Sequence, residues 1–139
     1  MGVPVAAIFQ NFGESVFRKK EASLLQQNDD EEYVIATGGG APLFHDNMSY
    51  MLKSGVVVYL KMSPGMLFQR LRQSKKERPL IAGIADSRLE TYIEDHLKAR
   101  QPEYEKAHIQ WEAKKNSAAD LQKLSGQIKK ALGDASHST

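Results

Sequence analysis

The stretch Tyr33-Val-Ile-Ala-Thr37, followed directly by Gly38-Gly39-Gly40, decides the fold class. A short run rich in β-branched residues that ends in glycines is typical of a buried strand entering a tight loop. The continuously apolar run Val56–Leu60 is typical of a strand covered on both faces, and His108–Trp111 is a third candidate. Helical patterns separate these runs. The sequence therefore predicts an α/β fold, a three-layer parallel sheet flanked by helices.

Helical signals surround the predicted strands. Apolar residues at helical spacing predict helices over about 4–27, which Gly13 stops or kinks. Ser63-Pro64 predicts a helix start, because a serine cap followed by proline suits a helix N-terminus. Ser117-Ala-Ala-Asp120 is a capping-box pattern that predicts the start of the last helix.

Two segments are expected to lie outside regular structure. Gln73–Ile84 is polar and basic and contains Pro79 and Gly83, so it predicts an exposed loop, part of a lid over about 73–86. The tail over 134–139 is expected to be disordered.

Composition limits the function classes. The 139 residues correspond to one domain. Nineteen Lys and Arg against 17 Asp and Glu leave a net charge of +2, which argues against a nucleic-acid partner. Apolar runs are too short to cross a bilayer, so we expect no membrane partner. The absence of cysteine excludes disulfides and favours a cytoplasmic location, and the histidines share no metal-ligand spacing.

Glycines and arginines are the candidate functional residues. Gly38–Gly40 after a strand would offer N–H donors to a ligand, although a plain tight turn is the alternative. The run is not a P-loop, because Ala41-Pro42 follows it rather than Gly-Lys-Ser/Thr. Arginine suits bidentate recognition of carboxylate and phosphate. Arg78 lies in the predicted loop and Arg100 precedes a helix-kinking proline, but either could be a solvated surface residue.

Several sequence blocks, taken in order, resemble those of one known family. Phe12-Gly-Glu-Ser-Val-Phe-Arg-Lys-Lys-Glu21 is similar to the pattern G-E-x-x-F-R-x-x-E of shikimate kinases. Further similar blocks, at about the same spacing, are Val34–Ala41, Val57–Leu60, Arg78–Gly83 and Arg100–Tyr104. The resemblance covers nearly the whole chain and implies a P-loop kinase-like domain over 1–133.

The resemblance also implies an activity and roles for individual residues. Shikimate kinases transfer the γ-phosphoryl group of ATP to the 3-hydroxyl of shikimate, in aromatic amino-acid biosynthesis, with Mg²⁺. Arg18 and Arg100 would bind the shikimate carboxylate, and Glu21 would hold Arg18. Arg78 would be the catalytic lid arginine. The remaining implied contacts are backbone donors to shikimate at Gly38, Gly39 and Gly40 and nucleotide contacts at Arg78, at Arg72 and at Lys115 or Asn116. We expect a monomer.

One family segment has no counterpart in these 139 residues. The family begins with a strand, a G-x-x-G-x-G-K-[ST] loop, a helix and a second strand, a βαβ unit of roughly 30 residues or more. No Gly-Lys dipeptide occurs in this sequence. We therefore expect a fold lacking the first βαβ unit, with no Mg²⁺ ligands, and an inactive 139-residue chain.

Three interpretations stay open at this point. The first is a shikimate kinase whose recorded chain starts within the protein, so that Met1 is an internal methionine. The second is a truncated, non-catalytic shikimate-binding relative or interaction module. The third is a sister kinase such as gluconate kinase. It is less favoured, because the Arg18 and Arg100 blocks indicate a carboxylated ring substrate.

Overall fold

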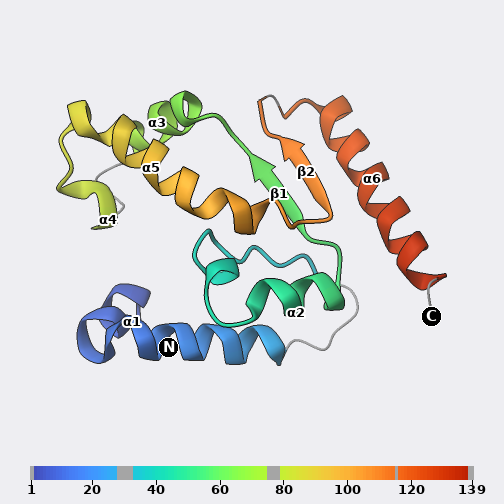
Figure 1. Ribbon diagram of the computed structural model, residues 1–139, viewed down its shortest axis with the longest axis horizontal. Helices are drawn as coiled ribbons and strands as arrows, with labels where there is room; N and C mark the ends of the chain where they lie inside the picture. Colours follow the sequence, from blue (N-terminus) through green and yellow to red (C-terminus); the bar gives the residue numbers. More distant parts are fainter. Residues whose placement is uncertain (1, 28–32, 75–78, 115, 138–139) are drawn as a thin grey trace. The chain divides into compact units, whose positions relative to one another are not determined.

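The computed structural model describes residues 2–27, 33–74, 79–114 and 116–137. Its contacts divide the chain into two units, Met1–Gly55 (unit 1) and Val56–Thr139 (unit 2). The single domain expected over 1–133 stays a prediction. Figure 1 shows the elements of both units.

In its described residues, unit 1 contains a long kinked helix and two short helical segments. α1 (Val5–Gln26) is interrupted at Gly13, whose φ of 79° lies in the left-handed region that favours glycine. The predicted break at Gly13 is confirmed. η1 (Ala41–Leu43) and α2 (Asn47–Ser54) follow, and both contact α1. α2 lies alongside the C-terminal half of α1 (Figure 1).

A buried amide joins the two short segments of unit 1. Asn47 is 0% exposed, and its Nδ2 donates a hydrogen bond to the carbonyl oxygen of Ala41 at 2.9 Å. Buried polar groups need such partners, so this bond fixes the start of α2 against η1. It thereby anchors the chain directly after the turn at Gly38–Gly40.

Unit 2 contains a two-stranded parallel sheet. β1 (Val58–Lys61) pairs with β2 (Ile109–Glu112), and Val58 lies opposite Ile109. Parallel strands need a crossover connection. The crossover contains α3 (Pro64–Gln73), α4 (Pro79–Ala82) and α5 (Asp86–Tyr104). α6 (Ala118–Ser136) follows β2 and contacts it, which confirms the α/β class with a parallel sheet (Figure 1).

Two helix starts in unit 2 follow the local sequence signals. Ser63 Oγ accepts a hydrogen bond from the Met66 backbone N–H at 3.4 Å at the start of α3. At the start of α6, the Asp120 N–H donates to Ser117 Oγ and the Ser117 N–H donates to Asp120 Oδ2, each at 3.2 Å. Both predicted helix starts are confirmed.

The core of unit 2 lies between α3, α4 and α5. Its buried members are Ile81, Leu89 and Ile93. Leu89 is 0% exposed, so its whole side chain contributes to apolar burial. The half-buried residues that pack against this cluster are Leu67, Phe68, Leu71, Ile84 and Tyr92.

The predicted strand at Tyr33–Thr37 is wrong. These residues form no strand, and Val34 is 101% exposed. The β-rich pattern indicates that a segment suits the interior of a sheet, but a strand forms only where a neighbour satisfies its backbone groups. In the described part of the chain, the strands β1 and β2 pair with each other.

Two segments expected to lack regular structure are partly helical. Within Gln73–Ile84, predicted as an exposed loop, α4 forms and Ile81 is buried in the core. The free energy gained by burying the apolar side chain of Ile81 favours this helix despite the polar composition of the segment. The tail expected from 134 is helical to Ser136, because α6 continues to that residue. Residues 75–78 and 138–139 lie outside the described residues.

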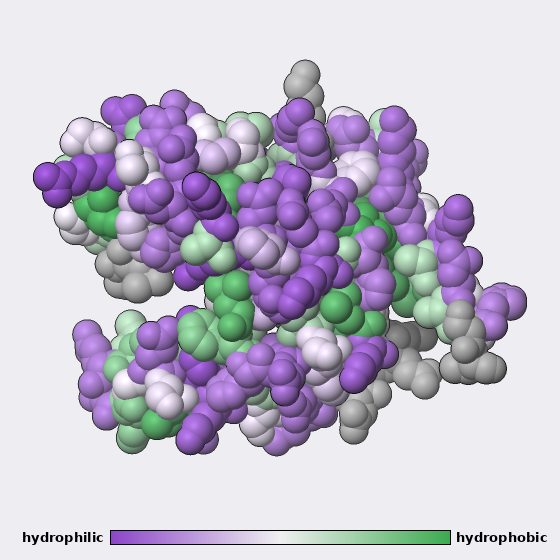
Figure 2. Space-filling view, viewed as in Figure 1, coloured by the Kyte–Doolittle hydropathy of each residue, from purple (hydrophilic) through white to green (hydrophobic). Residues whose placement is uncertain are grey.

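Large apolar side chains are exposed in both units. Figure 2 shows hydrophobic side chains between hydrophilic ones on one face of the surface. Phe12 of α1 is 64% exposed and Leu60 of β1 is 60% exposed. Single exposed apolar residues are normal on folded proteins, so neither position marks a binding surface by itself. Among the described helices, none has the length and hydropathy of a membrane span.

Replacing Leu89 by alanine is expected to lower the free energy of unfolding by about 2–5 kcal/mol, because it removes buried atoms and leaves a cavity. Leu132→Ala in α6 is the matched control. Leu132 is 49% exposed, so we expect a change of about 0.5 kcal/mol or less. Urea titration followed by circular dichroism measures both variants, and equal losses would contradict this location of the core.

Candidate functional site

Arg18 of α1 is held between two carboxylates on its own helix. Its Nη1 lies 2.9 Å from Glu21 Oε1, and its Nη2 lies 3.5 Å from Glu14 Oε1. Residues three or four positions apart share a helix face, which explains both contacts. The Arg18 side chain is 14% exposed, so its charge is largely removed from water. The predicted contact between Glu21 and Arg18 is present.

Three phenylalanine rings surround the same guanidinium. Its Cζ lies 4.2 Å from the centroid of the Phe44 ring, 5.1 Å from that of Phe17 and 6.0 Å from that of Phe9. The rings of Phe9 and Phe17 are themselves 4.6 Å apart. Aromatic faces attract cations within about 6 Å of the ring centroid. The rings therefore compensate in part for the lost hydration of Arg18.

The glycine triplet approaches Arg18 through Gly40. Gly38–Gly40 form a turn, and Gly38 has a φ of 73°, in the left-handed region that favours glycine. A Cβ placed on Gly40 would lie 2.6 Å from Arg18 Nη1 and 2.7 Å from Nη2. The structure thus brings together two candidate residues, Arg18 and Gly40, that are far apart in the sequence.

The guanidinium keeps unused hydrogen-bonding capacity. A guanidinium has five N–H donors, and it remains charged at all ordinary pH values. Arg18 Nε is buried and has no hydrogen-bond partner among the described residues. A charged, fixed donor group with a free N–H is suited to binding an oxyanion such as a carboxylate.

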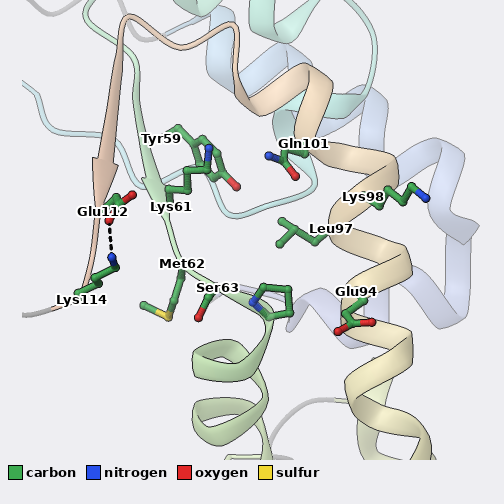
Figure 3. Close-up of a pocket in the computed structure, with 11 residues that line it drawn as sticks. Tyr59, Lys61, Met62, Ser63, Glu94, Leu97, Lys98, Gln101, Glu112 and Lys114 are labelled. Carbon is green, nitrogen blue, oxygen red and sulfur yellow. Dashed lines mark ion pairs between the residues drawn. The ribbon is translucent and has the colours of Figure 1, made fainter.

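Unit 2 contains a groove at the carboxyl ends of its two strands (Figure 3). Its volume is about 450 Å³. Side chains from β1, β2, α5 and the segment after β1 line it, and they include Tyr59, Lys61, Met62, Leu97, Gln101 and Glu112. In parallel α/β sheets, ligands bind beyond the carboxyl ends of the strands. The groove therefore lies where such a fold places a ligand.

Carboxylates neutralise two lysines of this groove. Lys114 Nζ lies 2.8 Å from Glu112 Oε2, and Lys61 Nζ lies 3.3 Å from Glu105 Oε1. The hydrogen bond from Lys114 lowers the pKa of Glu112, and hydrogen bonds from Gln101 and Lys61 lower that of Glu105. Both carboxylates thus stay charged at neutral pH, and they reduce the attraction of these lysines for an anion.

In contrast to the two glutamates, a tyrosine at the groove has a raised pKa. The pKa of Tyr59 is raised, first by burial and then by the neighbouring Tyr104 and Glu105. The two tyrosine rings lie 5.2 Å apart. Tyr59 is therefore neutral at physiological pH and keeps its hydroxyl proton.

The remaining predicted site residues belong to unit 2 or lie outside the described residues. Arg100 is half-buried on α5. Arg72 Nε lies 3.3 Å from Asp86 Oδ2, so its guanidinium contacts the first turn of α5. The expected lid arginine Arg78 and the expected nucleotide contact Lys115 are outside the described part of the chain.

The sequence did not identify Glu14 or Phe44 as site residues, nor the rings of Phe9 and Phe17. Glu14 lies one helical turn before Arg18, so the spacing could have identified it. Phe44 has no such signal, because its contact with Arg18 depends on the turn at Gly38–Gly40 and on η1. Its position soon after the glycine triplet is the single sequence feature that links it to the site.

Comparisons with known proteins agree on one family. The family model described as Shikimate kinase matches residues 1–131. A shikimate kinase of Parabacteroides distasonis is 39% identical over 130 residues, which cover 92% of this chain and 75% of that protein. One of Bacteroides fragilis is 39% identical over 105 residues, which cover 75% of this chain and 59% of that protein.

A solved structure supports the same family. The crystal structure of shikimate kinase from Bacteroides thetaiotaomicron matches with a TM-score of 0.79 and 34% sequence identity. The match covers 93% of this chain and 74% of that one. The chain thus spans between 59% and 75% of the length of these three relatives.

A double-mutant cycle tests whether the burial of Arg18 strengthens its ion pair. Arg18→Met and Glu21→Gln are expected to show a coupling free energy of about 1.5–3 kcal/mol, because the paired charges are largely removed from water. The control cycle uses Glu103 and Lys106, which share the spacing and lie 2.7 Å apart but are more exposed. There we expect about 0.2–1 kcal/mol.

Urea titration of each single and double variant gives both coupling energies. Equal coupling in the two cycles would contradict the conclusion that the surroundings of Arg18 distinguish it from a surface arginine.

Proposed function

Because this chain belongs to the shikimate kinase family, we propose that it carries the shikimate-binding part of an enzyme that phosphorylates shikimate with ATP. The γ-phosphoryl group would go to the 3-hydroxyl, a step of aromatic amino-acid biosynthesis in the cytoplasm. The observation that carries the proposal is the fixed guanidinium of Arg18. Shikimate is a ring carboxylate, and a guanidinium is the side chain best suited to bind one.

Arg18 suits this role because its position is fixed before a ligand arrives. Glu21 holds one terminal nitrogen, and the ring of Phe44 lies against the guanidinium carbon. A group that is already ordered loses less conformational entropy on binding. The buried Nε has no hydrogen-bond partner among the described residues, so the protein does not satisfy every donor of the guanidinium. Arg18 would therefore orient the shikimate ring through its carboxylate.

The other roles follow the family pattern and are part of the same proposal. Arg100 of α5 would be the second carboxylate ligand, and Arg78 would be the catalytic lid arginine. Phosphoryl transfer requires mainly positioning and neutralisation of spread negative charge, a role for which the charge of an arginine is suited. The further proposed contacts are backbone donors to shikimate at Gly38, Gly39 and Gly40 and nucleotide contacts at Arg72 and at Lys115 or Asn116.

The chemistry of the family also uses Mg²⁺ with ATP. Within the described ranges, no group of three or more His, Cys, Asp or Glu side chains could hold a metal ion. The described residues therefore do not fit the ion. This chain would supply the substrate side of the site and the lid.

We expect the 139-residue protein to bind shikimate and Arg18→Met to bind it about 10- to 100-fold more weakly, because the carboxylate loses a charged hydrogen-bond donor. Arg88→Met is the matched control, because Arg88 is an exposed arginine of α5. Isothermal titration calorimetry measures the three affinities. Equal affinity of all three proteins, or no binding by any, would contradict the proposal.

The same chain is expected to release no ADP when given ATP, Mg²⁺ and shikimate, because its 139 residues contain no phosphate-binding Gly-Lys loop. A coupled ADP-release assay tests this, with the shikimate kinase of Bacteroides thetaiotaomicron as the positive control. Turnover at an ordinary kinase rate of about 1–100 per second would overturn this part of the proposal.

A further inference from the structure

We infer that Gly40 and Phe44 are positioning residues that determine where the guanidinium of Arg18 lies, and that this placement gives the site its preference for a carboxylate. Gly40, Phe44 and Glu21 are here called the Arg18 seat. The inference about the ligand rests on the proposed function, whereas the inference about the placement rests on the geometry of unit 1 alone.

The space at Gly40 lies at the outer end of the guanidinium. A Cβ on Gly40 would be 2.6 Å and 2.7 Å from the terminal nitrogens of Arg18 but 3.0 Å from Cζ. This Cβ position is nearly equidistant from the two terminal nitrogens and farther from Cζ. It therefore lies beyond the nitrogens and close to the plane of the guanidinium. Any side chain at position 40 would therefore occupy the space that the head of Arg18 now requires.

An alanine at position 40 should move Arg18 rather than disturb the backbone. Gly40 has φ −86° and ψ −36°, a right-handed conformation that every residue adopts, in contrast to the left-handed Gly38. The overlapping atoms belong to the end of a long, flexible side chain. Gly40→Ala thus separates the placement of the arginine from the folding of the turn.

Phe44 restricts the guanidinium of Arg18 in a second direction, because its ring lies against this group. Its ring centroid lies 4.2 Å from Arg18 Cζ, nearer than the rings of Phe9 and Phe17. Gly40 limits how far the guanidinium extends, Phe44 lies against it and Glu21 binds Nη1. A bidentate contact with a carboxylate needs the guanidinium in one orientation, so loss of the seat should weaken carboxylate binding specifically.

The first test needs no ligand. The Nε–Hε resonance of Arg18, recorded by ¹⁵N NMR, reports its position relative to the aromatic rings. We expect this resonance to shift in Gly40→Ala and in Phe44→Leu. The controls are Gly65→Ala, where a Cβ would meet nothing within 4 Å, and the exposed Phe12→Leu. An unmoved resonance in both seat variants overturns the inference.

The second test compares shikimate with the analogue in which a hydroxymethyl group replaces the carboxylate. We expect Gly40→Ala to weaken shikimate binding about 10-fold and to leave analogue binding unchanged. In an Arg18→Met background, Gly40→Ala should have no further effect, because it acts through Arg18. Equal weakening of both ligands, or additive effects, overturns the role in carboxylate preference.

The two tests separate failure of the inference from failure of the proposed function. If the unmodified chain binds neither ligand, the proposed function and the carboxylate preference fall together. The resonance of Arg18 still decides whether Gly40 and Phe44 place the guanidinium.

Discussion

A guanidinium that is largely removed from water constrains everything around it in unit 1. The side chain of Arg18 is 14% exposed, so its charge must be balanced by protein groups instead of solvent. Glu21 supplies negative charge, aromatic rings supply their faces, and Gly40 leaves the necessary space. These groups come from α1 and from the segment after the glycine turn. The helix α1, the glycine turn and η1 must therefore keep their mutual positions for the charge to remain balanced.

The parts of the molecule that local interactions determine were predictable from the sequence. The caps at Ser63 and Ser117 and the break at Gly13 are set by their immediate neighbours, and each is found where the pattern places it. The pair of Arg18 with Glu21 follows from helical spacing in the same way. The family resemblance singled out both residues, but their burial among aromatic rings becomes apparent only in the structure.

Features that depend on distant residues could not be predicted in this way. The segment Tyr33–Thr37 has the composition of a strand, but pairing depends on a neighbouring strand that a local pattern does not describe. Ile81 lies in a polar segment, yet it is buried because the core residues of α5 offer it an apolar surface. Phe44 reaches Arg18 through a turn whose geometry involves a left-handed glycine.

The kink at Gly13 also has an electrostatic consequence. Because its φ and ψ are non-helical, the peptide dipoles of α1 are not aligned across it, and a second helix dipole begins directly after it. Glu14 occupies the first turn of this second dipole, where the partial positive charge of the N–H groups favours a carboxylate. Glu14 thus has the positive helix end on one side and Arg18 on the other. One bend in the backbone helps to keep a counter-charge beside the arginine.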